Sequence, residues 1–125
     1  MKILVMNPNS TASMTDKIVE SARQKASVGT EIIGASGTDA PASIQGHYDE
    51  AMSVPGLLAR LKQAEADGID GVVVACFDDP GIGACREVFS GPVLGICEAA
   101  VKAASMISTS FSVVTTLPRS VPVIE

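Results

Sequence analysis

Apolar residues along this chain fall into short continuous runs separated by longer amphipathic segments. The short runs are rich in Val, Ile and Leu, a composition that predicts β-strands buried on both faces, as in a parallel sheet. The expected strands are residues 2–6, 29–35, 72–75, 93–96 and 111–114. The segments between them have capping residues and helical spacing, which predict helices. The expected helices run from a cap among residues 10–13 to about 25, then 48–66, 80–89 and 98–107.

This alternation predicts an α/β fold, a doubly wound and mostly parallel sheet of four to five strands in a single domain, residues 1–125. We expect the flavodoxin-like strand order 2-1-3-4-5, which places the first and third strands side by side. Their carboxyl ends then form the topological switch point, where ligands bind in open α/β sheets. One local conflict stands out, because Pro55-Gly56 lies inside the second helical segment and predicts a break or kink there.

The composition of the chain argues against two classes of binding partner. The chain has 125 residues and is 46% hydrophobic but only 3% aromatic, so aliphatic side chains and Met must build the core. A net charge of −5 argues against nucleic acid and anionic membrane surfaces as partners. We expect no membrane association, because no apolar run is long enough to span a bilayer, and Ile3–Met6 is too short for a signal peptide.

The three cysteines, Cys76, Cys85 and Cys97, cannot all pair with one another, and their spacing fits no zinc motif. Reduced thiols in a cytoplasmic protein are therefore expected, and no metal site is predicted. We interpret Cys85 and Cys97 as packing residues, because most free cysteines behave as small buried hydrophobes.

Cys76 has the position of a functional residue. It follows the buried strand 72–75 and precedes Asp78-Asp79-Pro80, a pattern that predicts a helix start with proline in its first turn. Free amides at such a helix terminus lower the pKa of a thiol, whereas the two neighbouring carboxylates raise it. From its position alone, Cys76 is either a reactive thiol or a packing residue.

The predicted topology surrounds Cys76 with polar residues. Asn7 ends the first strand and should point into the cleft beside Cys76, with the loop around Ser43 on one side and Thr115-Thr116 further along. The other candidates have simpler explanations. His47 fits a surface or capping residue, Asp78-Asp79 fits helix capping better than metal binding, and Gly81-Ile82-Gly83 is too short for a dinucleotide motif.

Several segments together resemble the hydantoin and allantoin racemases of the aspartate/glutamate racemase superfamily. They follow one another in family order along essentially the whole chain. They are residues 7–11 (Asn-Pro-Asn-Ser-Thr), 43–51, 75–81 (Ala-Cys-Phe-Asp-Asp-Pro-Gly), 92–100 and 111–116. The resemblance covers the amino-terminal half of the family pattern, and the tail 117–125 is expected to lead towards the second half.

The resemblance implies a cofactor-independent enzyme with two similar halves, each supplying one cysteine on either side of the substrate's stereocentre. Cys76 would be the amino-terminal catalytic thiol, and Asn7, Ser43 and Thr115-Thr116 would help to bind substrate. The amides of Phe77 and Asp78 would hold a substrate oxygen. The family chemistry is physically sound, because proton removal beside a carbonyl builds enolate charge that oriented N–H donors stabilise.

No residue in this chain matches the second family cysteine. We therefore expect the chain alone to be inactive as a racemase and to self-associate as a homo-oligomer through its exposed apolar surface. Two alternatives remain open. One keeps the fold and the cysteine but acts on aspartate, glutamate or a malonate derivative. The other is a non-catalytic unit that binds a small ligand or pairs with another subunit.

Overall fold

A four-stranded parallel sheet forms the centre of the computed structural model, which describes residues 1–124. Its strands are β1 (Lys2–Asn7), β2 (Glu31–Ser36), β3 (Gly71–Val74) and β4 (Val93–Gly95). They lie in the order β2-β1-β3-β4, and all three neighbouring pairs are parallel. This confirms the predicted α/β class and the predicted order of the first four strands.

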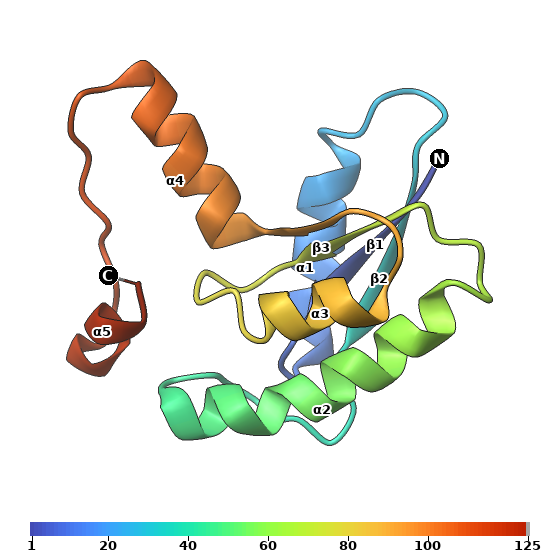
Figure 1. Cartoon of the computed structure of the whole chain (residues 1–125), viewed down its shortest axis with the longest axis horizontal. Helices are drawn as coiled ribbons and strands as arrows, with labels where there is room; N and C mark the ends of the chain where they lie inside the picture. The colour runs from blue at the N-terminus through green and yellow to red at the C-terminus, as the bar shows by residue number, and fades with distance from the viewer. Residues whose placement is uncertain (125) are drawn as a thin grey trace.

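Helices cover both faces of the sheet (Figure 1). On one face, α2 (His47–Ala64) and α3 (Ile82–Val88) bury a single apolar cluster against β1, β3 and β4. On the other face, α1 (Ala12–Arg23) packs Val19 against Val5 and Ile32. The two clusters follow from strand geometry, because successive side chains point to opposite faces. Leu4 and Met6 of β1 therefore belong to the first cluster and Val5 to the second.

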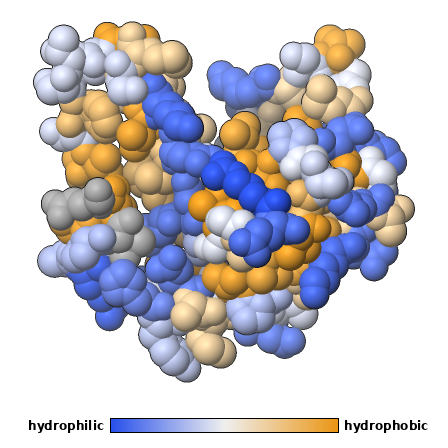
Figure 2. All heavy atoms as spheres, in the orientation of Figure 1, coloured by the Kyte–Doolittle hydropathy of each residue, from blue (hydrophilic) through white to orange (hydrophobic). Residues whose placement is uncertain are grey.

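The α1 face of the sheet is only partly covered. Beside α1 lies an apolar trough of about 800 Å³, lined in part by Val73, Ala75 and Ile96. Leu94 of β4 is 53% exposed next to it, opposite Val73 in the strand register. The following helix, α4 (Ile96–Ile107), stands away from the sheet, and none of its residues is buried (Figures 1 and 2). Apolar side chains are visible on the lobe that α4 and the tail form in Figure 2.

The sequence predicts a break or kink at Pro55-Gly56, and the structure shows no break there. Helix α2 is continuous through Pro55, because residues on both sides of the proline, such as Ser53 and Leu57, are fully buried against the rest of the domain. An internal proline removes one backbone hydrogen bond, and here tertiary packing outweighs that loss. Gly56 is part of the reason, since it lets the helix approach the backbone of Thr38 closely.

The predicted fifth strand is wrong. Residues 111–114 are extended but join no strand, and the described sheet has four strands. Helix α4 begins at Ile96, two residues earlier than predicted, and carries the chain away from the edge of β4. Phe111 and Val113 instead line a pocket of about 300 Å³ together with Ala100, Val101 and Ala104 of α4. A 3-10 turn (Pro118–Ser120) and α5 (Val121–Ile124) follow. Of the expected tail 117–125, Glu125 lies outside the described residues.

Candidate active site

Cys76 lies in the turn between β3 and α3, at the carboxyl edge of the sheet. The Ala75 amide donates to the carbonyl of Met6 at 2.8 Å, which brings the ends of β1 and β3 together. The Asp79 amide donates to the Cys76 carbonyl at 3.1 Å and closes the turn. Asp79 has a φ of +46°, a left-handed conformation that is uncommon for a residue with a side chain. The half-buried Cys76 therefore lies at the switch point, as the topology predicts.

The structure corrects the predicted start of the following helix. Helix α3 begins at Ile82 with Gly81 as its N-cap, rather than at Pro80, and no side chain caps it. Asp78 and Asp79 are therefore free of the capping role that the sequence suggested for them at this helix. The α3 terminus also lies further along the chain from the thiol than the sequence predicted.

The electrostatic balance at Cys76 favours the protonated thiol. Burial raises the pKa of Cys76, and the carboxylates of Asp78, Asp79 and Glu50 raise it further. A hydrogen bond from the Asp78 amide lowers this pKa but does not offset the other effects. Sequence reasoning identified both tendencies at the turn, and in the structure the raising effects prevail.

Acidic side chains gather around this turn. Burial raises the pKa of Asp78, the nearby carboxylates of Glu50 and Asp79 raise it further, and His47 lowers it. Glu50 lies in the first turn of α2, and its Oε2 is 3.5 Å from Nδ1 of His47. The amino end of α2 thus contributes both an acid and a histidine to the surroundings of Cys76.

Asp79 makes a contact that the sequence did not suggest. Its Oδ1 accepts the Cys97 amide at 3.0 Å, and its Oδ2 accepts the Glu98 amide at 2.8 Å. Both amides belong to the first turn of α4, where backbone N–H groups have no partner within the helix. Asp79 therefore caps α4 from the Cys76 turn, rather than the helix that immediately follows it in sequence.

Asn7 lies at the same edge of the sheet as Cys76, but its amide is engaged in the β1–α1 turn. Its side chain is buried, and Nδ2 donates to Asn9 Oδ1 at 2.8 Å and to Thr15 Oγ1 at 3.0 Å. Its Oδ1 accepts the Asn9 amide at 3.2 Å. The Asn7 amide therefore holds the β1–α1 turn in this structure.

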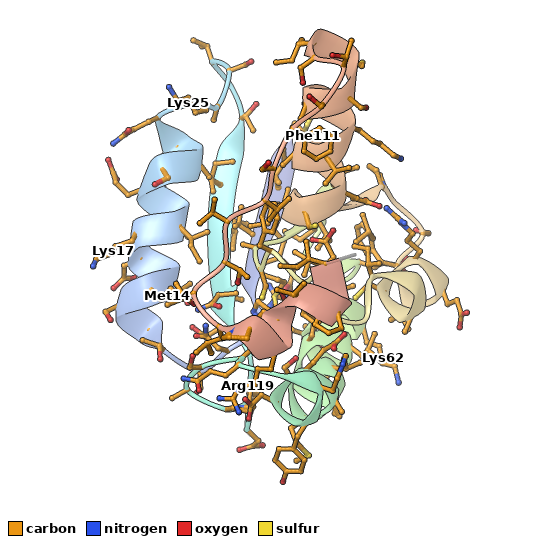
Figure 3. All side chains as sticks on the ribbon, turned by 90° about the vertical axis from the view of Figure 1, so that its left-hand side faces the viewer. Met14, Lys17, Lys25, Lys62, Phe111 and Arg119 are labelled. Atoms are coloured by element: carbon orange, nitrogen blue, oxygen red, sulfur yellow. The ribbon has the colours of Figure 1, made fainter. Side chains whose placement is uncertain are left out.

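The remaining predicted binding residues lie on three different segments of the chain. Ser43 is exposed in a loop that is tied to the β1–α1 turn, since Thr11 Oγ1 donates to the carbonyl of Ala42 at 2.7 Å. Phe77 is 36% exposed and lines the pocket beside α4. Thr115 and Thr116 are exposed in the extended tail, instead of ending a fifth strand. Figure 3 shows this tail running from Phe111, next to α4, to Arg119.

The other two cysteines have different environments. Cys85 is fully buried in the main apolar cluster, and burial raises its pKa to about 11. Cys97 lies in the first turn of α4, where burial and the carboxylates of Asp79, Asp78 and Glu98 raise its pKa. Across residues 1–124 no three His, Cys, Asp or Glu side chains are grouped closely enough to hold a metal ion. Over the same residues no helix has the length and apolar character needed to cross a membrane.

Residues 3–125 match the family described as Asp/Glu/hydantoin racemase. The chain belongs to this racemase family. Relatives in the family include the hydantoin racemase of Rhizobium meliloti, 59% identical over the whole of this chain and 52% of the relative. The hydantoin racemase of Pseudomonas sp. (strain NS671) is 46% identical over the whole chain and 50% of the relative.

Solved structures of the racemase family have the same fold. An allantoin racemase from Klebsiella pneumoniae superposes with a TM-score of 0.96 at 44% identity, over 99% of this chain and 51% of that chain. An allantoin racemase from Pseudomonas fluorescens superposes with a TM-score of 0.94 at 38% identity, over 99% and 52%. The chain therefore spans about half the length of the racemases it matches.

Sequence reasoning missed two features of the site in this racemase-family chain. Glu50 lies within the predicted helix 48–66, and nothing in that pattern indicates that its carboxylate acts on the Cys76 thiol. Arg119 was not considered, but its Nη2 donates to Gln45 Oε1 at 2.8 Å and ties the tail to the loop before α2. The only signal for Glu50 was its place within the resembling segment 43–51.

Proposed function

We propose that this chain supplies one of the two acid–base thiols of a cofactor-independent racemase acting on 5-substituted hydantoins or allantoin-like ureides. Cys76 is the thiol, and it acts on one face of the substrate's stereocentre. The observation that carries the proposal is the placement of a half-buried Cys76 at the switch point, in a chain that matches hydantoin racemases along its whole length.

The protonation state of Cys76 defines its step in the reaction. Racemisation removes a proton from one face of C5 and delivers a proton to the other, so one thiol must be ionised while the other is not. The raised pKa keeps Cys76 protonated near neutral pH in this chain. Cys76 therefore donates the proton to C5 in one direction, and after its own deprotonation it abstracts a proton in the reverse direction.

The acidic surroundings favour a neutral substrate. The carboxylates of Glu50 and Asp79 raise the pKa of Asp78, and all three carboxylates raise the pKa of the Cys76 thiol. A substrate such as aspartate or glutamate would add negative charge to this cluster and be repelled. A hydantoin ring or a ureide carries no carboxylate at the reacting carbon, so it fits the site better.

Backbone amides and polar side chains supply the remaining interactions. The amides of Phe77 and Asp78 lie beside the thiol and stabilise oxygen charge as the enolate forms. Ser43, Thr115 and Thr116 would bind the polar ring atoms, and Asn7, whose amide is engaged in the β1–α1 turn, would act by holding that turn. The Asp78 amide also donates to Cys76, so it supports the thiolate when that form is needed.

One thiol serves only one face of the substrate. Cys97 lies in the first turn of α4, at the same edge of the sheet as Cys76, so it would approach a substrate from nearly the same side. We therefore expect the chain alone not to racemise a hydantoin at an enzymatic rate. The longer relatives would supply the second thiol from the half that this chain does not match.

Ligand protection of Cys76 tests this proposal. The chain is alkylated with iodoacetamide, and peptide mapping follows Cys76, with Cys97 as the internal control. We expect a 5-substituted hydantoin or allantoin at millimolar concentration to slow labelling of Cys76 and to leave labelling of Cys97 unchanged. Protection by aspartate or glutamate alone would support the alternative substrate class. Equal labelling with every compound would contradict a substrate site at Cys76.

A further inference from the structure

We propose that Asp79 is a positioning residue that ties the Cys76 turn to the start of α4 and so holds the Cys76 thiol against the Asp78 amide. The inference rests on the proposed function only in the importance it gives to Cys76. Asp79 acts through the turn, because its side chain reaches the first turn of α4.

The first line of evidence is the pair of hydrogen bonds from α4. Both carboxylate oxygens of Asp79 are used, one by the Cys97 amide at 3.0 Å and the other by the Glu98 amide at 2.8 Å. A negative charge at a helix amino terminus is favourable, and hydrogen bonds to a charged acceptor are the stronger kind. These two bonds link segments that are 18 and 19 residues apart in sequence.

The second line of evidence is the backbone of Asp79. Its φ of +46° is strained for a residue with a side chain, and such strain persists only where the surrounding structure imposes it. The same residue donates its amide to the Cys76 carbonyl and accepts the Ile82 amide on its own carbonyl. Asp79 is thus the point where the turn, α3 and α4 are connected.

Helix α4 is also capped by a residue of its own, Glu98. Glu98 Oε1 accepts the Gly95 amide at 3.2 Å and pairs with Arg86. Helix α4 therefore has its own acidic residue at its amino terminus without Asp79. Gly95 leaves the space that Asp79 needs, because a Cβ atom at this position would overlap the Asp79 carboxylate. The contact therefore depends on both the Asp79 carboxylate and the absence of a side chain at Gly95.

The proposal predicts how the thiol responds when this contact is broken. The charged groups that face Cys76 are Asp78 and Asp79 on its own turn and Glu50 on α2. If Asp79 leaves the α4 amides, its charge loses their compensation and the turn loses its anchor. The Asp78 amide then separates from the thiol, and both changes disfavour the thiolate.

The decisive variant is Gly95→Ala, which removes no charge and leaves every residue of the turn in place. Its matched control is Gly83→Ala, because a Cβ at Gly83 meets nothing within 4 Å. The rate of Cys76 alkylation is measured against pH in both, with amide hydrogen exchange at Cys97 and Glu98. We expect Gly95→Ala to slow Cys76 alkylation about threefold at pH 8, a shift of about half a pKa unit, while Gly83→Ala matches the parent chain. An unchanged alkylation profile combined with faster exchange at Cys97 and Glu98 would show that Asp79 is only a helix cap, and would overturn the proposal.

Circular dichroism shows whether Gly95→Ala folds. If it does not fold, a second pair of variants tests the proposal. Asp78→Asn and Asp79→Asn each remove one carboxylate near the thiol. If Asp79 acts only through its charge, both substitutions lower the pKa of Cys76, and Asp78→Asn has the larger effect. We expect Asp78→Asn to lower it and Asp79→Asn to leave it unchanged or raise it; any lowering by Asp79→Asn would overturn the proposal. Because these measurements need no substrate, a failure of the proposed racemase function would leave their outcome intact.

Discussion

At the scale of single residues, three thiols in one domain have three different environments. Cys85 is fully buried, Cys76 is half-buried in a turn, and Cys97 lies in the first turn of a helix. The pKa of each is raised, first of all by burial. The rate at which each thiol reacts should therefore depend on its exposure to solvent and on whether a backbone amide donates to it. Of these three thiols, only Cys76 receives such a hydrogen bond from another residue.

Competitive alkylation should rank these thiols. We expect Cys76 to be labelled first and Cys85 last, because Cys85 has a pKa of about 11 and no exposed surface. The labelling rate of Cys76 should still be rising above pH 9, since its pKa is raised. Peptide mapping after partial labelling gives the order, and faster labelling of Cys97 in the folded chain would count against the assignment of Cys76.

Asp78 gives a prediction for stability. The folded chain binds the Asp78 proton more tightly than the unfolded chain does, so the contribution of this group to stability falls as pH rises. At pH 7 we therefore expect Asp78→Asn to raise Tm. The gain should disappear as pH falls towards the ordinary carboxyl value of 3.8. Thermal unfolding at pH 7 and pH 4 measures it, and a lower Tm at pH 7 would show that the Asp78 carboxylate is stabilising.

At the scale of elements, the sequence predicts most of the fold, and its errors have physical causes. The strands 2–6, 72–75 and 93–96 are apolar runs that local composition identifies, and all occur within a residue or two of their predicted ends. The order of the four strands is the one expected when helices connect parallel strands by crossovers on both faces of the sheet. The sequence predicts a break or kink at Pro55, but α2 is continuous because its apolar face is buried by distant parts of the chain, and no local pattern reports that burial.

The site was predictable to the same degree. Cys76 and Asn7 were located by their place after strands, which topology brings together. The role of Asp79 at α4 was not predictable, because its partners are 18 and 19 residues away and depend on a left-handed backbone. The same is true of residues 111–114, whose composition favours a strand but whose neighbour in space is α4.

A pair of glycine substitutions tests the account of α2. Gly56→Ala places a Cβ atom against the backbone of Thr38, which cannot move aside as a side chain can. We expect a loss of about 2 kcal/mol in the free energy of unfolding. Gly83→Ala in α3 has open space around it and should gain up to about 1 kcal/mol from helix propensity. Urea unfolding measures both, and equal effects of the two substitutions would contradict the close approach of α2 to Thr38.

At the scale of the whole molecule, the uncovered part of the sheet is the main departure from a closed domain. A parallel sheet is normally covered on both faces, yet here an apolar trough of about 800 Å³ lies beside α1, and Leu94 is 53% exposed. The exposed apolar residues of α4, including Met106 and Ile107, add to this surface. Such surfaces promote association.

Self-association should therefore depend on this surface. We expect light scattering to show dimers or larger species, and Leu94→Glu to shift the chain towards monomer by placing a charge at the edge of the trough. The matched control is Val28→Glu, since Val28 is fully exposed in the turn after α1. If the parent chain is a monomer at tens of micromolar, the apolar face does not drive association.

The central claim is that Cys76 is an acid–base thiol serving one face of a hydantoin. It is tested most directly by incubating the chain with each enantiomer of a 5-alkyl hydantoin separately in D₂O at pH 9. The C5 proton is followed by NMR and the chirality by circular dichroism, with Cys76→Ser as the control. We predict that the parent chain exchanges the C5 proton of one enantiomer for deuterium while its circular dichroism signal persists, and that Cys76→Ser reduces exchange to the uncatalysed rate. Exchange at the same rate in Cys76→Ser would contradict the role of Cys76, and rapid loss of the circular dichroism signal with the parent chain would contradict the single-face mechanism.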